Sequence, residues 1–232
     1  MPVYARMKKL AAEFIGTFAL VFAGTGAIII DHASGGVIGH AGVALTFGLI
    51  VMVMIETFGD VSGAHLNPAV TIGFAVARGF PKTDVPRYIA AQLLGALTAS
   101  GLLRVLFPAD ATLGATLPAG PWWQSFTLEV LLTFFLMLTI LNVTTGSKEK
   151  GITAGLTIGG LIALEAMFAG PISGASMNPA RSLAPALASG NLTELWIYLV
   201  APTLGALLAV PVCACVRDNG CCRAQPSSGS IA

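Results

Sequence analysis

The segments Ser62-Gly-Ala-His-Leu-Asn-Pro-Ala-Val70 and Ser173-Gly-Ala-Ser-Met-Asn-Pro-Ala-Arg181 decide how this chain folds. They are separated by 111 residues (173 minus 62), and six of their nine positions are identical. Each copy leads into a short apolar stretch, 67–76 or 178–187. As a helix, such a stretch is roughly 15 Å long, half the thickness of the hydrocarbon core of a bilayer. The chain therefore consists of two related halves, and each half contains one apolar segment that is too short to cross a membrane.

Long apolar runs make up most of the remaining sequence. Of the 232 residues, 55% are apolar and 10% are charged, whereas soluble domains average about 45–50% and 25%. Six runs are long enough for transmembrane helices, namely 11–30, 38–58, 86–106, 124–143, 151–169 and 192–213. We therefore expect an all-α membrane protein with six transmembrane helices and two re-entrant half-helices. The formal net charge of +1 argues against a nucleic-acid partner.

The number of spans determines how the two halves are oriented. Three full spans per half is an odd number, so the second half must be inserted upside down relative to the first. We expect one inverted repeat over residues 1–115, a second over 116–216, and a cytoplasmic tail at 217–232. Ten of the twelve Lys and Arg residues fall on one side, which the positive-inside rule makes cytoplasmic. This predicts a multi-pass protein of the inner or plasma membrane with both termini in the cytoplasm.

The two Asn-Pro-Ala triplets predict where the half-helices begin. Asparagine is a preferred N-cap and proline a preferred first helical residue, so helices start at Asn67-Pro68-Ala69 and Asn178-Pro179-Ala180. Inverted symmetry brings both N-termini to the bilayer midplane, each with about half a positive charge from its backbone dipoles. Cations and hydrated protons are repelled there. With each asparagine carbonyl held by the cap, both NH₂ groups are free to donate to a neutral solute.

The six spans, the two triplets and the arginine directly after the second triplet resemble the aquaporin, or major intrinsic protein, family. The resemblance covers nearly the whole chain. The segments 62–71, 89–96 and 169–182 are most similar to the nodulin-type intrinsic proteins of plants and their bacterial relatives. The resemblance implies a homotetramer with one pore per subunit, which passes water, glycerol and neutral metalloid acids such as arsenous or boric acid. It implies neither a cofactor nor a catalytic step.

In this family four residues form a narrow selectivity filter on the outer side of the paired asparagines. By motif offset these four are Phe47, Ala166, Ala175 and Arg181. Phe47 and Ala166 then lie near the outer ends of their spans, where the second half-helix enters. Water-selective members typically carry histidine at the position of Ala166. The two alanines leave room beside the aromatic ring, so we expect a pore wide enough for glycerol-sized solutes.

Each of these residues also has a structural interpretation. Phe47 can pack against lipid or a neighbouring helix, small residues such as Ala166 and Ala175 permit close helix packing, and Arg181 can form a structural ion pair. The pore role of the alanines depends on the resemblance alone. The chain departs from the family at Asp60, where histidine is usual, and at Glu165, where asparagine is usual. Because Glu165 is adjacent to Ala166, we expect it to point away from the solute path into helix packing.

Other polar residues have less specific roles in the sequence. By the resemblance, His65 lines the cytoplasmic vestibule; the histidines have no metal-ligand spacing, so no metal site is expected. Glu13 and Glu129 occupy equivalent positions in the two halves and are candidates for a proton relay. We favour the family role instead, in which they accept hydrogen bonds from the backbone of the descending loops.

The cysteines cluster at the end of the chain, at positions 213, 215, 221 and 222. A structural disulfide is not expected at a cytoplasmic end, where thiols stay reduced. Binding of a soft metal or metalloid, palmitoylation and an idle tail all remain open for this cluster.

The sequence as a whole predicts a passive channel for water and small uncharged solutes, surrounded by lipid. A water-selective channel is one alternative. A coupled secondary transporter is another, and it requires an ion or proton site near the midplane. A membrane enzyme is not expected, because isolated glutamates are the only candidate catalytic residues.

Overall fold

The chain forms a bundle of helices in a computed structural model that describes residues 3–77, 80–144 and 153–216. Six helices are long and apolar enough to span a membrane: α1 (Val3–Ala33), α2 (Gly39–Ser62), α4 (Val85–Leu106), α5 (Trp122–Val143), α7 (Ala154–Ser173) and α9 (Leu195–Val216). Two short helices accompany them, α3 (Pro68–Ala77) and α8 (Pro179–Ser189). The predicted fold class, with six spans and two half-helices, is confirmed.

The ends of the long helices differ from the sequence prediction for physical reasons. The first helix begins at Val3 rather than near residue 11, because its charged first turns extend beyond the apolar run that marks the hydrocarbon core. Helix α7 continues through Pro171 to Ser173. Helices α2 and α7 both end at a glycine in the left-handed conformation, Gly63 (φ 91°) and Gly174 (φ 82°). Glycine adopts this backbone without steric cost, and the chain turns there into the bundle.

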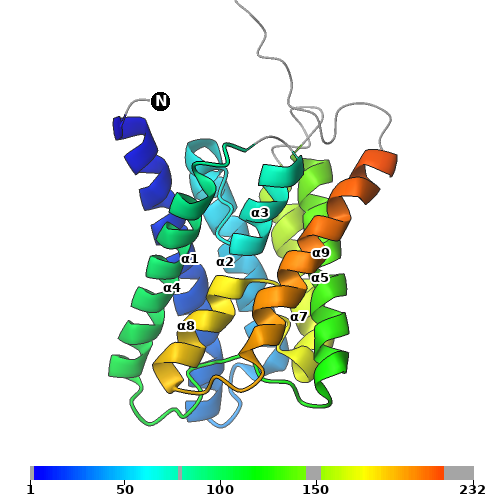
Figure 1. The fold of residues 1–232 in the computed structure, drawn as a ribbon. Coiled ribbons are helices and arrows are strands. Elements are labelled where there is room, and N and C mark those ends of the chain that lie inside the picture. The colour runs from blue at the N-terminus through cyan, green and yellow to red at the C-terminus, as the bar shows by residue number, and fades with distance from the viewer. Residues whose placement is uncertain (1–2, 78–79, 145–152, 217–232) are drawn as a thin grey trace, which may run out of the picture.

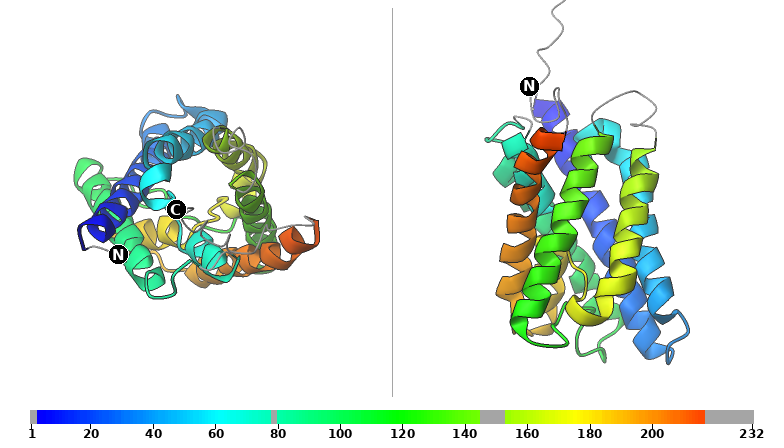
Figure 2. Two further views of the ribbon diagram at one scale, coloured as in Figure 1. Left: turned by 90° about the horizontal axis from the view of Figure 1, so that it is seen from above. Right: turned by 90° about the vertical axis from the view of Figure 1, so that its right-hand side faces the viewer.

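The long helices pack in three main pairs around a central axis. Helix α1 packs along α4, α5 along α9, and α2 along α7, while α1 and α2 join two of these pairs. Seen from above, the helices form a ring (Figure 2). The two half-helices enter this ring from opposite ends and occupy opposite halves of the bundle (Figure 1). Helix α3 packs against α9 and α8 against α4, so each half-helix is held by a long helix of the other half of the chain.

Close backbone approaches hold the helix pairs together. Gly95 of α4 lies against the carbonyl of Phe14 on α1, and Gly205 of α9 lies against the carbonyl of Val130 on α5. A Cβ at either glycine would collide with that backbone oxygen. Small residues permit such approaches in membrane helices, where lipid gives no hydrophobic drive for association. The two contacts occupy equivalent places in the two halves of the chain.

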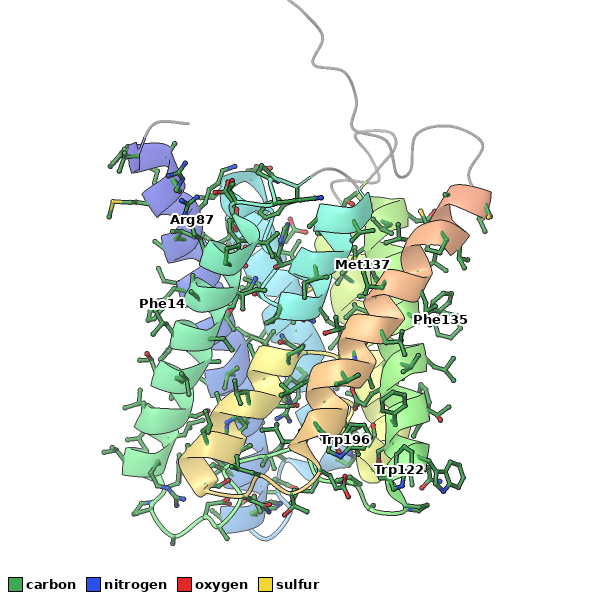
Figure 3. All side chains as sticks on the ribbon, in the orientation of Figure 1. Phe14, Arg87, Trp122, Phe135, Met137 and Trp196 are labelled. Atoms are coloured by element: carbon green, nitrogen blue, oxygen red, sulfur yellow. The ribbon has the colours of Figure 1, made fainter. Side chains whose placement is uncertain are left out.

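The two ends of the bundle differ in their side chains. Trp122 and Trp196 lie together at one end, with ring centroids 5.6 Å apart, and Arg87 lies at the other end (Figure 3). Tryptophan is enriched at membrane interfaces, where its ring meets the headgroups. The start of α1 and the end of α9 both lie at the Arg87 end (Figures 1 and 3).

Candidate functional site

Two loops descend into the middle of the bundle, and each is tied to a buried glutamate. In the first loop, Glu13 Oε1 accepts hydrogen bonds from Ser62 Oγ (2.7 Å) and the His65 N–H (2.9 Å). Its Oε2 accepts from the Leu66 N–H (2.8 Å) and from Gln92 Nε2 (2.8 Å). The carboxylate therefore has partners on both oxygens, and it fixes the path of the backbone before Asn67.

The second loop has the same arrangement around Glu129. Its Oε1 accepts from Ser173 Oγ (2.9 Å) and the Ser176 N–H (2.8 Å), and its Oε2 accepts from the Met177 N–H (2.8 Å). A tyrosine hydroxyl also donates to the serine carbonyl in each half, Tyr88 to Ser62 (2.9 Å) and Tyr198 to Ser173 (2.7 Å).

These bonds hold a backbone conformation that L-residues rarely adopt. In the first loop Ala64 and Leu66 have φ of 45° and 51°, and in the second Ala175 and Met177 have φ of 41° and 54°. Left-handed conformations of residues other than glycine cost free energy and persist only where surrounding contacts impose them. The glutamate bonds to the N–H groups of Leu66 and Met177 supply such contacts.

The asparagines cap the half-helices and also join them. Asn67 Oδ1 accepts from the Ala69 N–H (2.9 Å), and Asn178 Oδ1 accepts from the N–H groups of Ala180 (3.0 Å) and Arg181 (3.3 Å). Asn67 Nδ2 donates to the Met177 carbonyl (2.7 Å), and Asn178 Nδ2 donates to the Leu66 carbonyl (2.9 Å). The expectation that each NH₂ group is wholly free is therefore wrong. Each asparagine donates one N–H to the opposite loop, because the two loops are in contact, and this leaves its second N–H.

A narrow cavity of about 80 Å³ runs past this junction. Both asparagines and the backbone of both loops form its polar side. The facing wall is apolar and is contributed by Leu20, Val51, Ile55, Leu136, Ile140, Ile158 and Ile162. A solute in this cavity meets donors and carbonyls on one side and hydrocarbon on the other. Such a wall orients a polar solute without surrounding it with partners.

A second, wider cavity of about 380 Å³ opens toward the tryptophan end of the bundle. Asp31, His32, His40 and Thr116 are among the residues that line it. Phe47, Ala175 and Arg181 are the residues that line both cavities, whereas Ala166 lines the wider one only. Three of the four residues expected at the filter thus lie where one cavity gives way to the other, and the fourth lies beside them.

Arg181 is held rigidly at this junction. Its Nη1 donates to the Gly114 carbonyl at 2.7 Å, and its Cζ lies 4.9 Å from the centroid of the Phe47 ring. Its Nε is buried and has no partner within the described parts of the chain. A planar guanidinium fixed in this way keeps donors in a defined direction. The structural alternative, an ion pair of Arg181, has no partner among the residues that the structure describes, because the ion pairs found there involve Arg6, Arg87 and His32.

His65 lies at the other end of the narrow cavity, which it helps to line. Its Nδ1 is 3.2 Å from Thr71 Oγ1, and its ring stacks on Phe74 at a centroid distance of 4.6 Å. Phe80 and Tyr88 complete an aromatic cluster around it. The histidine is therefore fixed by neighbours on several sides.

The two positions that depart from the family lie away from the cavity walls. Glu165 is buried in α7 and lines neither cavity, and its Oε2 has no hydrogen-bond partner among the described residues. Asp60 is exposed near the end of α2. Cys213 is disulfide-bonded, which contradicts the expectation of reduced thiols, and Cys215 is an exposed free thiol. Positions 221 and 222 lie outside the described residues.

Several residues of this site were not predicted from the sequence. Gln92 bridges Glu13 and Thr71, with Nε2 distances of 2.8 and 3.0 Å. Tyr88 and Tyr198 are related by an offset of 110 (198 minus 88), close to that of the two motifs, so extending the repeat comparison would have revealed this pair. The carbonyl that holds Arg181 gives no sequence signal, because any residue supplies a carbonyl.

Comparisons with known proteins agree with this architecture. The family model described as major intrinsic protein matches residues 3–212. Aquaporin NIP1-1 of Oryza sativa subsp. japonica is 49% identical over 202 residues, which cover 87% of this chain and 71% of that protein. Nodulin-26 of Glycine max is 44% identical over 212 residues, or 91% of this chain and 78% of that protein.

A solved structure shares the fold. The X-ray structure of the aquaglyceroporin from Plasmodium falciparum matches with a TM-score of 0.80 and 28% identity, covering 89% of this chain and 94% of that one. Together with the paired half-helices, these matches show that the chain belongs to the major intrinsic protein family.

Proposed function

We propose that the chain is a passive transmembrane channel for water and small uncharged solutes, including glycerol and neutral metalloid acids such as arsenous or boric acid. The observation that carries this proposal is the pair of capped asparagines, Asn67 and Asn178, which face one narrow cavity from opposed half-helices. Relatives named aquaporin and nodulin-26, and a fold shared with an aquaglyceroporin, support it. No chemical step is involved.

Exclusion of cations follows from the charges around the junction. The N-termini of α3 and α8 meet there, each with about half a positive charge, and the Arg181 guanidinium adds a full charge on the outer side. A cation that enters the cavity from bulk water is repelled by these charges, and the apolar wall offers it no ligands in place of its hydration shell. A neutral hydroxyl oxygen instead accepts a bond from the remaining asparagine N–H groups.

The filter that we propose consists of Phe47, Ala166, Ala175 and Arg181. Ala166 and Ala175 contribute only methyl groups beside the aromatic ring, which leaves room for a solute with several hydroxyls. We assign His65 to the cytoplasmic vestibule, and Glu13 and Glu129 to support of the two loops. The inverted repeats then cover residues 1–115 and 116–216.

The membrane arrangement is part of the same proposal. We place both termini in the cytoplasm of the inner or plasma membrane. The first turns of α1 carry Arg6, Lys8 and Lys9, and α1 begins at the same end of the bundle as Arg87 (Figures 1 and 3). By its family, the chain assembles as a homotetramer with one pore per subunit. The mass of the purified protein in detergent, measured by native mass spectrometry, tests the tetramer directly.

Light scattering on reconstituted vesicles tests the channel. Vesicles with the protein should shrink faster in sucrose than empty vesicles, re-swell in glycerol and take up arsenous acid, all without an ion gradient. Transport that requires a proton or sodium gradient would instead establish a coupled transporter. Fast shrinkage with no glycerol entry would establish a water-selective channel.

The Arg181→Ala variant tests the filter in the same vesicles. Loss of the fixed charge should raise proton and cation leak and loosen selectivity among neutral solutes, while water flux persists. Unchanged leak and unchanged solute ratios would remove Arg181 from the filter.

A further inference from the structure

The glycine at position 24 lies on the buried side of α1, directly against the ring of Phe47 on α2. A Cβ added to Gly24 would lie 2.5 Å from both Cδ1 and Cζ of that ring, a distance that real Cβ atoms essentially never show. The atoms that it would meet belong to the ring edge and not to the backbone. The present position of the ring therefore requires a residue without a side chain on α1.

The opposite side of the ring faces the pore. Phe47 lines both cavities, and the Arg181 guanidinium lies across from it, with Cζ 4.9 Å from the ring centroid. Ala166 and Ala175 end in methyl groups, so Phe47 is the bulky apolar side chain opposite Arg181. How far its ring retreats toward α1 decides how much space a solute finds beside Arg181.

We propose that Gly24 is a specificity-determining residue of this channel, because it leaves the notch on α1 into which the Phe47 ring withdraws from the pore. This inference rests on the filter role proposed for Phe47. A methyl group at position 24 fills the notch and pushes the ring edge away from α1. Because Phe47 lines both cavities, a ring that is pushed away from α1 moves toward the solute path.

The consequence depends on solute size. Water needs little width, whereas glycerol must pass with its carbon skeleton beside the ring and its hydroxyls toward Arg181. One added methyl group in a close-fitting site changes discrimination by about tenfold or more. The Gly24→Ala variant should therefore lower glycerol permeability by about tenfold and water permeability by much less, so that the ratio of glycerol to water falls.

Stopped-flow light scattering on proteoliposomes that contain the full chain measures both permeabilities. The matched control is Gly26→Ala on the same helix, where an added Cβ would meet Leu103 Cδ2 at 3.5 Å, an ordinary contact. This control should keep the wild-type ratio. A second variant combines Gly24→Ala with Phe47→Leu, since the smaller side chain has no ring to displace. It should recover most of the glycerol permeability that Gly24→Ala loses.

The outcomes separate this inference from the proposed filter. If Phe47→Leu alone changes the glycerol-to-water ratio but Gly24→Ala leaves it unchanged, the filter stands and the role of Gly24 is overturned. If Phe47→Leu changes nothing, the filter assignment itself fails. If Gly24→Ala abolishes both permeabilities and Phe47→Leu does not rescue them, Gly24 serves helix packing only, which also overturns the inference.

Discussion

In the filter that we propose, each residue at the junction of the two cavities contributes a different property. Arg181 is fixed by the Gly114 carbonyl and supplies charge and donors. Phe47 supplies an apolar surface, and the methyl groups of Ala166 and Ala175 supply space. This combination fits a neutral solute whose hydroxyls face the charged group and whose carbon atoms face the aromatic ring. The proposed selection therefore depends on the small size of Ala166 and Ala175 as much as on the polarity of Arg181.

The size of residue 166 should control which solutes pass. Replacing Ala166 with His places a bulky polar ring at the wall of the outer cavity next to Arg181. Glycerol flux should fall by about tenfold, as expected for steric exclusion in a close-fitting site, and water flux should fall less. Swelling assays on matched vesicle preparations give both rates. Equal reductions of the two fluxes would show that the width of the pore is not set at this position.

The two re-entrant loops are the elements on which the pore depends. Each loop contains two residues in the left-handed conformation, and each is tied by its N–H groups to one buried carboxylate. The asparagine after each loop caps its own half-helix and donates to the other loop. The two loops therefore stabilise one another, so a substitution in one loop should destabilise both half-helices.

Removing one carboxylate should destabilise this junction. In Glu129→Gln, an amide NH₂ faces donors where Oε1 or Oε2 accepted, so at least one of the Ser173, Ser176 and Met177 donors is left without its acceptor. A buried unsatisfied donor costs about 1–3 kcal/mol. The melting temperature of the protein in detergent should fall. The exposed Glu56→Gln is the control and should melt as the wild type does; equal melting of both variants would rule out the supporting role of Glu129.

The loop between α4 and α5 should contribute less to the stability of the protein in acid. Burial by itself raises the pKa of Asp110, but hydrogen bonds from the N–H groups of Leu113 and Thr112 and from His32 outweigh it and lower the pKa. The ionised carboxylate therefore stabilises the fold above the ordinary aspartate pKa. That stabilisation is lost as the pH falls through the lowered pKa. Gly114, which follows Leu113 in this loop, accepts a hydrogen bond from Arg181 through its carbonyl.

Melting curves across acid pH test this expectation. Asp110→Asn should melt below the wild type at neutral pH, and the difference should shrink as the pH drops below about 4, the ordinary aspartate range. Asp60→Asn, at an exposed site, is the control and should show no such dependence. A constant difference at every pH would contradict the role of the ionised carboxylate.

At the scale of the whole molecule, the sequence was sufficient to predict the arrangement of helices. It was not sufficient to predict where the helices end or how the two loops contact each other. Apolar runs of about 20 residues leave helices as the only solution in lipid, so six spans and two half-helices followed directly. Helix ends did not follow, because α1 continues beyond the apolar run to Val3. The bonds of the asparagines to Leu66 and Met177 also escaped prediction, since they depend on loop backbones brought together only by the complete fold.

Arg104 is one of the two basic residues that do not fall on the predicted cytoplasmic side, and its contacts explain its position. Arg104 lies in the last turn of α4, where Nε and Nη2 are 3.3 and 3.1 Å from the Ala188 carbonyl and Nη1 is 3.1 Å from the Asp110 carbonyl. It thus ties the loop between α4 and α5 to the end of α8, and its positive charge lies beside carbonyls at a helix C-terminus. Its exception to the rule reflects a structural bond and leaves the orientation argument intact.

The orientation itself can be measured with the exposed thiol of Cys215 at the end of α9. If both termini are cytoplasmic, a membrane-impermeant maleimide should leave the wild-type protein unlabelled in intact cells and label it once the membrane is opened. Ser34→Cys is the counterpart at the opposite end, since Ser34 is exposed in the turn between α1 and α2. That variant should be labelled in intact cells. Labelling of the wild type in intact cells would instead place the Arg87 end outside and reverse the direction in which a solute meets the filter and then His65.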